Sequence, residues 1–542
     1  MQQRFIVLIS ILLGFSSIQA QLLTTAEKSD YASTSTFEDV MNFTQTLLDQ
    51  YDLIRMETLA TSVEGRNIPL FIVADPMPAS PEDLKDDDRI VVYFQANIHA
   101  GEVEGKEATQ MLMRDLLKDH PRDIFRNVVL LVCPIFNADG NEKISPKNRT
   151  NQNGPVNGVG LRHNGQYLDL NRDAMKLESP EMRGVVENIF NRWDPAITVD
   201  CHTTNGSYHE EPVTFVWMMN PNGDRNLINF ARDEMMPAVH ENLLKDYNVE
   251  NVFYGEFINR MNPDSGWISY APEPRYMVNY IGLRNRIGIL NENYVYADFK
   301  TRVNGCYYLL KTILDYSASK KQLIKQTISS AERRLDNRYK LGRPDVFALE
   351  YEGVATPEKI TIKAIEADTI PGVKGYWRYK QSDRKRTVTV DYIADYYATE
   401  TTTIPFAYLL TVPEPMVLEN LKSHGIQVEK LDQQMNLPVE RFEISDLKAS
   451  ERLFQGHYQN KVEGSYVADT VSFDAGTYVV YTSQNLGNLA AYLFEPQSDD
   501  GYLKWNFLDR YLVPQWGRYY YPYPVYRLMN VTPVPSSPIS KD

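Results

Sequence analysis

The chain has 542 residues, 43% of them hydrophobic, and a formal net charge of -15 at pH 7. This composition is typical of a globular protein long enough for two or three domains. The negative charge disfavours nucleic acid and anionic membrane surfaces as partners, because both demand clustered positive charge. Cysteine occurs three times, an odd number that excludes a full disulfide framework.

The first twenty residues have the pattern of a secretory signal peptide. Arg4 precedes a continuous apolar run from Phe5 to Leu13, and the segment ends with the small residue Ala20. The run is shorter than the roughly 20 apolar residues that cross a bilayer, so we expect no stable membrane insertion. Gln21 stands where a lipoprotein would carry a cysteine. We therefore predict that residues 1–20 direct export, to the periplasm or the medium.

A polar leader at 21–36 precedes an alternation of predicted helices and strands. The apolar residues of 37–51 recur at helical spacing. Apolar runs then predict buried strands at 68–74, 90–96, 128–135 and 196–200, with helices at 104–118 and 182–193. This alternation predicts an α/β fold with a mostly parallel mixed sheet flanked by helices.

The pattern of polar and apolar residues changes after about residue 316. Residues 317–334 are polar and favour a helix, and Gly342-Arg343-Pro344 interrupts it. Beyond this point, short alternating runs such as 359–362, 387–392 and 477–481 are typical of half-buried strands. We predict an α/β domain at 37–316, a helical linker at 317–344 and a smaller β-rich region at 345–542.

A candidate metal site begins just after the predicted strand 90–96. His99 and Glu102 follow that strand, at the end where α/β sheets place their ligands. A histidine and a glutamate three residues apart can reach one metal from the same turn, and zinc accepts both donors. Alternatively, His99 packs at a strand end and Glu102 favours a helix N-terminus. The pair alone does not decide between these interpretations.

His202 is the candidate third ligand. It follows the short apolar strand 197–199, so we expect it at a strand-to-loop junction on the same sheet edge as His99. Two histidines and one glutamate leave the fourth position of a tetrahedral zinc ion open, which is the arrangement of a catalytic site. We expect one zinc ion per chain, although the donor set does not exclude cobalt or manganese.

Five motifs in this order resemble those of the zinc metallocarboxypeptidase family, typified by carboxypeptidase A, and segments 476–480 and 495–501 resemble those that follow the catalytic domain in some exported bacterial members. The five motifs are His99-Ala100-Gly101-Glu102, Asn137-Ala138-Asp139-Gly140, Asp169-Leu170-Asn171-Arg172, His202 and Ile289-Leu290-Asn291-Glu292. Carboxypeptidase A is itself a standard example of a zinc site with two histidines and one glutamate. The resemblance therefore implies that His99, Glu102 and His202 are the zinc ligands.

The resemblance implies that Glu292 is the general base, which takes a proton from zinc-bound water and passes it to the leaving amine. The predicted strand 287–290 can bring it close to the metal, whereas the plainer interpretation is an ordinary strand-end carboxylate. Arg149 lies where the family has an arginine that stabilises the tetrahedral oxyanion. A loop arginine that is merely solvated is the alternative for Arg149.

Asn171 and Arg172 match the family positions that hold the terminal carboxylate of the substrate. A guanidinium gives a bidentate, charge-assisted grip on a carboxylate, which favours exopeptidase action. The alternative for Arg172 is a surface ion pair with Asp173 or Glu178. Asp173 itself departs from the family pattern, because many relatives have asparagine there.

Two further positions follow from the resemblance. Asp169 matches a carboxylate that orients a zinc-bound histidine, which we take to be His99. Tyr254 and Tyr270 are both candidates for the tyrosine that covers the substrate in this family. The residue that sets side-chain preference is not identified by the sequence.

The expected function is zinc-dependent hydrolysis of peptide bonds, with peptides as substrates and carboxypeptidase action as the leading form. One alternative is a zinc-dependent amidase or deacylase that acts on a non-standard amide such as a cell-wall stem peptide. Another is a catalytically silent binding protein, which the presence of Glu292 beside three ligands argues against. The sequence leaves the oligomeric state open.

Overall fold

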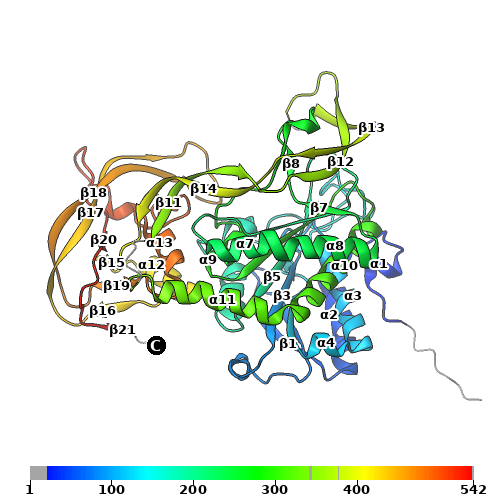
Figure 1. Cartoon of the computed structure of the whole chain (residues 1–542), viewed down its shortest axis with the longest axis horizontal. Helices are drawn as coiled ribbons and strands as arrows, with labels where there is room; N and C mark the ends of the chain where they lie inside the picture. Colours follow the sequence, from blue (N-terminus) through cyan, green and yellow to red (C-terminus); the bar gives the residue numbers. More distant parts are fainter. Residues whose placement is uncertain (1–20, 341–344, 376–377, 540–542) are drawn as a thin grey trace, which may run out of the picture.

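The computed structural model describes residues 21–340, 345–375 and 378–539, so the predicted signal peptide lies outside the described residues. An α/β body and a β-rich region lie side by side along the long axis of the molecule (Figure 1). The predicted polar leader contains a short helix, α1 (Thr25–Lys28). Among the described residues, no helix is long and apolar enough to cross a membrane.

The α/β body is built on an eight-stranded sheet in the order β1-β2-β4-β3-β5-β10-β6-β7. Strands β4, β3, β5 and β10 run parallel to one another, as β7 does to β6, while β1, β2 and β6 pair antiparallel. The predicted mixed, mostly parallel sheet is therefore confirmed. Its strands are β1 (Ile54–Thr61), β2 (Asn67–Val73), β3 (Ile90–Ala96), β4 (Val128–Cys133), β5 (Ile197–Thr204), β6 (Val213–Trp217), β7 (Asn251–Phe253) and β10 (Ile287–Tyr294).

Helices cover both faces of this sheet, which explains why the central strands are apolar throughout. Side chains of α2, α3, α7, α8, α10 and α11 join one hydrophobic core, and those of α6 and α9 join the core on the other face. The larger helices are α2 (Phe37–Gln50), α3 (Glu104–Asp119), α6 (Pro180–Val185), α7 (Arg225–Phe230), α8 (Met236–Tyr247), α9 (Met277–Leu283), α10 (Phe299–Ser319) and α11 (Lys321–Asp336). Short helices α4 (Arg122–Phe125) and α5 (Ala138–Asn141) follow α3 and β4.

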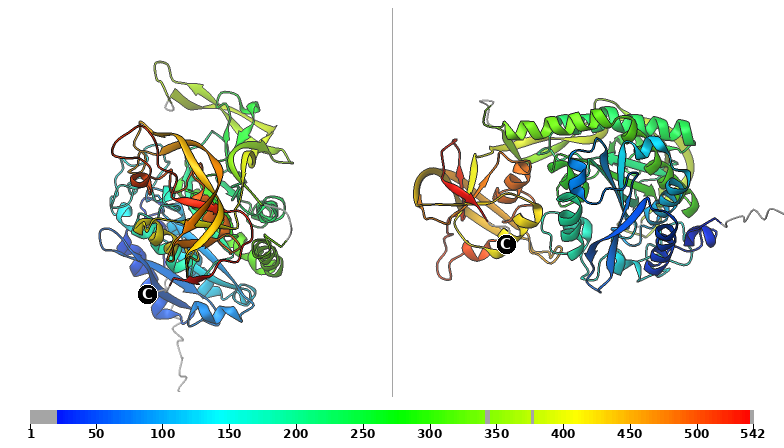
Figure 2. Two further views of the ribbon diagram at one scale, coloured as in Figure 1. Left: turned by 90° about the vertical axis from the view of Figure 1, so that its left-hand side faces the viewer. Right: turned by 90° about the horizontal axis from the view of Figure 1, so that it is seen from below.

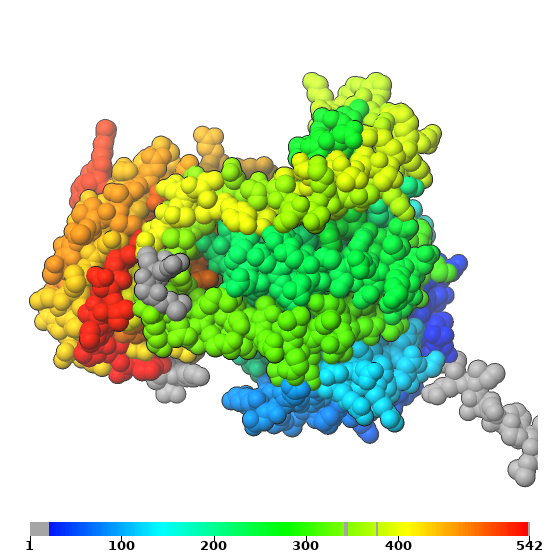
Figure 3. Space-filling view, viewed as in Figure 1, coloured from blue at the N-terminus to red at the C-terminus, as the bar shows by residue number. Residues whose placement is uncertain are grey.

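The C-terminal region is rich in strands, as predicted, and also holds two helices, α12 (Pro415–His424) and α13 (Gly487–Phe494). Seven strands form a sheet in the order β18-β17-β20-β15-β19-β16-β21. The hairpin of β12 and β13 projects from the top of the molecule (Figure 3). The strands are β11 (Val346–Ala355), β12 (Ile360–Thr369), β13 (Tyr379–Val390), β14 (Tyr392–Thr403), β15 (Ala407–Leu410), β16 (Glu429–Leu431), β17 (Met435–Ala449), β18 (Asn460–Phe473), β19 (Tyr478–Tyr481), β20 (Val525–Leu528) and β21 (Ser536–Pro538).

The C-terminal region packs against the α/β body. Strands β8 (Glu256–Phe257) and β9 (Trp267–Ile268) share a four-stranded sheet with β11 and β14. The hydrophobic core behind α6 and α9 continues into α12, α13 and the C-terminal strands. The right-hand view of Figure 2 shows the two parts side by side. The predicted domain boundaries at 316 and 344 stay a prediction, since strands from both sides of them pair.

His424, at the end of α12, is fully buried in this shared core. Its Nδ1 accepts from the Tyr280 hydroxyl at 2.8 Å, and its Nε2 donates to the Met175 carbonyl at 3.0 Å. Burial lowers the pKa of His424 to about 3. The ring is therefore neutral in the folded protein at pH values where an unfolded histidine is charged.

We expect His424 to make the free energy of unfolding fall as the pH is lowered. The folded pKa lies below the unfolded value of about 6.5, so this stabilisation is complete above pH 6.5 and is lost as the pH falls toward 3. The slope from one such group is at most about 1.4 kcal/mol per pH unit. Urea unfolding between pH 7.5 and 4.5 should show a shallower decline for His424→Gln, which keeps a donor and an acceptor. Parallel curves for the two proteins would contradict this assignment.

Candidate metal and catalytic site

Three buried side chains from two neighbouring parallel strands converge at one edge of the sheet. His99 and Glu102 lie in the turn that follows β3, and His202 lies within β5. The Nδ1 atoms of the two histidines are 3.1 Å apart, and each lies 3.1 Å from Oε2 of Glu102. These three donor atoms form a nearly equilateral triangle, the His/Glu cluster in the described residues that could hold a metal ion.

A second carboxylate fixes the orientation of each imidazole. Nε2 of His99 lies 3.0 Å from Oδ1 of Asp169, and Nε2 of His202 lies 2.7 Å from Oδ2 of Asp200. A carboxylate accepts hydrogen bonds, so each Nε2 carries the proton and each Nδ1 turns a lone pair toward the triangle. The two lone pairs and the Glu102 carboxylate then face one another. That arrangement is repulsive unless a positive charge lies among them.

The charges around the triangle also favour a cation. Burial opposes protonation of His202, but Asp200 and Glu102 hold its pKa well above the usual value. Burial likewise opposes ionisation of Glu102, yet His99 and Arg149 keep its pKa well below the usual value. Donor atoms bonded tetrahedrally to zinc at 2.0–2.1 Å are about 3.3 Å apart, close to the edges of this triangle. The residues present therefore fit a zinc ion.

Replacing Asp200 with alanine is expected to lower zinc affinity by about 10- to 100-fold, because the carboxylate that orients His202 is lost. Competition against a chromogenic chelator measures this affinity directly. Asp264→Ala is a suitable control, since Asp264 pairs with Arg386 at the exposed surface. Equal zinc affinities for Asp200→Ala and the unchanged protein would show that the orienting bond contributes nothing.

Glu292 lies in β10, directly beside His202 in the parallel register of β5 and β10. Its side chain is half-buried, and its buried Oε2 has no hydrogen-bond partner among the described residues. Burial raises the pKa of Glu292 to about 8. A cation bound by the adjacent triangle favours the ionised form of this carboxylate. Glu292 is thus an unengaged, basic carboxylate next to the metal ligands.

The predicted strand ends were too early on both sides of this site. We expected β5 to end near Asp200 and β10 near Leu290, with His202 at a strand-to-loop junction. The structure extends the pair to Thr204 and Tyr294, so His202 and Glu292 both lie within strands. The backbones of β5 and β10 stay paired through these polar residues. Sequence reasoning missed the extension because the apolar run ends before it.

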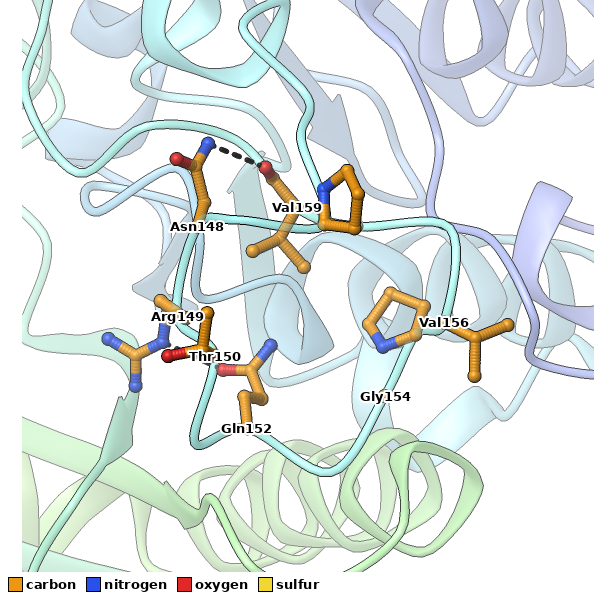
Figure 4. A pocket seen from close by; sticks show the side chains of 10 residues that line it. Asn148, Arg149, Thr150, Gln152, Gly154, Val156 and Val159 are labelled. Atoms are coloured by element: carbon orange, nitrogen blue, oxygen red, sulfur yellow. Dashed lines mark hydrogen bonds between the residues drawn. The ribbon is translucent and has the colours of Figure 1, made fainter.

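Two arginines approach Glu102, one of which the sequence did not identify. Arg149 donates to Oε1 of Glu102 at 2.8 Å, to the Thr203 carbonyl at 2.7 Å and to Gln152 at 2.8 Å. It is therefore held in place and not merely solvated. Its loop borders a cavity of about 240 Å³, where Figure 4 shows the Arg149–Gln152 hydrogen bond. The missed residue is Arg162, which lies 3.4 Å from the same carboxylate.

Asp200 could have been identified from the sequence, whereas Arg162 could not. Arg162 precedes the Asp169 motif by seven residues, and it pairs with that aspartate at 2.9 Å. Asp200 is two residues before His202, and residues two apart in a strand point to the same face. The alternation rule could therefore have identified Asp200, whereas nothing in a glycine-rich loop singles out Arg162.

Asn171 and Arg172 lie in the turn that Asp169 begins. Oδ1 of Asn171 accepts from the Met277 backbone at 2.9 Å, which leaves its amide N–H groups as donors. The Arg172 guanidinium stacks over the Tyr276 ring at 4.4 Å and donates to the Asn171 carbonyl at 2.7 Å. No carboxylate among the described residues forms an ion pair with Arg172.

The alternative ion pair for Arg172 is therefore not seen. Asp173 instead pairs with buried Lys176 at 3.0 Å and accepts from the backbone and hydroxyl of Ser179. The aspartate that departs from the family pattern thus has its own structural partners. The guanidinium of Arg172 can therefore pair with an anionic ligand.

The structure distinguishes the two candidate tyrosines. Tyr270 donates its hydroxyl toward the Trp217 carbonyl and Oδ1 of Asn279, at 3.3 and 3.2 Å. Burial, followed by the negative charge of Glu292, raises the pKa of Tyr254 well above its usual value. Both tyrosines thus have hydrogen-bond partners, Thr204 for Tyr254 and Trp217 and Asn279 for Tyr270, and the charge of Glu292 acts on Tyr254.

Comparisons with known proteins find similarity to carboxypeptidases. The family described as zinc carboxypeptidase matches residues 40–210. Carboxypeptidase 2 of Trichophyton equinum is 21% identical over 487 residues, which cover 86% of this chain and 81% of that protein. Carboxypeptidase D of Mus musculus is 26% identical over 171 residues, 30% of this chain and 12% of that protein. A metallo-carboxypeptidase from Burkholderia cenocepacia has a TM-score of 0.40 and 17% identity, covering 53% of this chain and 70% of that one.

The protein is thus a zinc metallopeptidase, an enzyme that hydrolyses peptide bonds. More narrowly, residues 40–210 are similar to the family described as zinc carboxypeptidase.

Proposed function

We propose that this metallopeptidase is an exopeptidase that removes residues from the carboxyl end of peptides. The observation that carries the proposal is the cationic group of Arg172, which has no acidic partner among the described residues and lies in the turn begun by Asp169. Asp169 in turn holds the metal-site residue His99. A guanidinium in this position suits the free carboxylate of a peptide.

When bound, zinc polarises the scissile carbonyl as a Lewis acid and acidifies water. Glu292 acts as the general base, taking a proton from the attacking water and delivering it to the leaving amine. Its location beside His202 and its lack of a hydrogen-bond partner support this role. Arg149, with Arg162 beside it, supplies positive charge that stabilises the developing oxyanion.

Asn171 and Arg172 bind the terminal carboxylate, and Tyr254 is the tyrosine that covers the substrate. The free amide N–H groups of Asn171 and the stacked guanidinium of Arg172 support the first assignment. The pattern of residues 1–20 supports export as the location. The two alternatives, a deacylase of non-standard amides and a silent binding protein, find no support in the comparisons.

A mixed peptide library tests the proposal. The protein, loaded with zinc, should release single residues from carboxyl ends, as read by mass spectrometry, and a chelator should abolish the release. Internal cuts would contradict the exopeptidase assignment and the role of Arg172. An absence of any cleavage by zinc-loaded protein would contradict both that assignment and the proposed base.

A further inference from the structure

A turn from the C-terminal region reaches the active-site residue Asp169. The turn lies in the connection between β17 and β18, the orange strands in Figure 1. Phe454 and His457 pair through two backbone hydrogen bonds of 2.9 and 3.0 Å, which places Gln455 and Gly456 at the tip. Oε1 of Gln455 accepts from the backbone N–H of Asp169 at 2.9 Å. These two residues are 286 positions apart in the chain.

Both residues at the tip have positive φ, which the two-residue turn requires and which a glutamine adopts only at a cost. Gln455 has a φ of 50° and Gly456 a φ of 81°, as in two-residue hairpin turns that favour asparagine or glycine. Glycine adopts positive φ freely, but a glutamine there incurs a cost. Strain of this kind persists where the surroundings hold it and often marks a functional position.

The Gln455 contact completes the hydrogen bonding of Asp169. The Asp169 carboxylate accepts from Nε2 of His99 at 3.0 Å, from the Asn171 backbone at 3.1 Å and from Nε of Arg162 at 3.0 Å. Its carbonyl accepts from the Arg172 backbone at 3.0 Å. The remaining hydrogen-bonding group of Asp169 is its backbone N–H, which donates to Oε1 of Gln455. Asp169 thus links a metal-site histidine to the turn of Asn171 and Arg172, and Gln455 fixes its main chain.

The turn is itself anchored to the same stretch of the α/β body. Nε2 of His457 lies 2.7 Å from Oε1 of Glu178, and Phe454 stacks near the Trp505 ring. Nζ of Lys176 lies 4.6 Å from the centre of the same indole. These contacts hold the tip against residues 169–178 on both sides of Gln455.

We propose that Gln455 is a positioning residue that holds the Asp169–Arg172 turn, so that the C-terminal region completes the site for a peptide carboxylate. This inference rests on the proposed carboxypeptidase function. It assigns to a region without catalytic motifs a part in binding the end of the substrate. Substrates without a free carboxylate should gain little from this contact.

The matched test uses Gln455→Gly and Gln455→Glu in the full chain, with Arg452→Ala as a control in the same connection. Glycine removes both the acceptor and the strain, whereas glutamate keeps an acceptor of the same length. Arg452 is exposed. For Gln455→Gly we expect an unchanged or higher unfolding temperature, with KM for peptides raised about twofold to tenfold, the range of one hydrogen bond. Zinc affinity, measured by chelator competition, should fall by a similar factor.

The outcomes separate this inference from the proposed function. A loss of zinc affinity or a rise in KM that Gln455→Glu restores, and that Arg452→Ala does not cause, supports the positioning role. Unchanged KM and zinc affinity in folded Gln455→Gly would overturn it, as would equal losses in the Arg452→Ala control. If the unchanged protein cleaves no peptide, the proposed function fails, and the zinc affinities still test Gln455.

Discussion

Replacing Glu292 with glutamine is expected to lower kcat by about 10²- to 10⁴-fold, the usual contribution of a general base. Glutamine has nearly the same shape but cannot accept a proton from water at neutral pH. Glu292 makes no ion pair in the described residues, and its Oε2 has no hydrogen-bond partner. The substitution should therefore leave the fold intact. KM and zinc affinity should change little, because the three ligand atoms belong to His99, Glu102 and His202.

Steady-state hydrolysis of a short peptide, with zinc content measured on the same samples, tests this expectation. Glu358→Gln is a matched control, since Glu358 is exposed and lies in the C-terminal region. A variant with full zinc and more than a tenth of the original kcat would exclude Glu292 as the base. Loss of zinc together with kcat would instead make Glu292 a part of the metal site.

The sequence predicted the central fold well because its strands are buried on both faces. Residues 90–96 form an almost continuous apolar run, and β3 has those bounds, since every residue there is buried. The candidate ligands were located for the same reason, because each follows or lies in such a strand. Prediction failed where buried strands carry polar residues. His202 and Glu292 lie beyond the predicted strand ends, in paired backbone that an apolar pattern does not reveal.

The C-terminal contribution to the site could not be predicted for a different reason. Gln455 has no chemistry of its own, and its role comes from a hydrogen bond to a residue 286 positions away. Likewise, β14 pairs with β9 across the predicted domain boundary. Local periodicity identifies a strand but not its partner, since register and neighbours depend on the packing of the whole chain. The change in hydrophobic pattern near residue 316 therefore indicated a different secondary structure. It did not show that the two parts share a core.

Replacing Arg172 with alanine is expected to lower kcat/KM for peptides with a free carboxyl end by about 10²-fold. A charge-assisted hydrogen bond contributes about 1.5–3 kcal/mol, and a guanidinium can form two to one carboxylate. In the described residues Arg172 pairs with no acid and stacks on Tyr276, so its removal leaves no buried carboxylate unpaired. The loss should therefore report on substrate binding and not on stability.

Peptides of one sequence, with a free or an amidated carboxyl end, separate these effects. The unchanged protein should strongly prefer the free acid, and Arg172→Ala should reduce that preference toward unity, because a neutral amide has no charge for the guanidinium to pair. Arg192→Ala, at an exposed arginine, should keep the full preference. If Arg172→Ala slows cleavage of both peptides equally, the arginine does not read the carboxylate. The exopeptidase assignment would then have to rest on another cation near the site, and the candidates are Arg149 and Arg162, which lie 2.8 and 3.4 Å from Glu102.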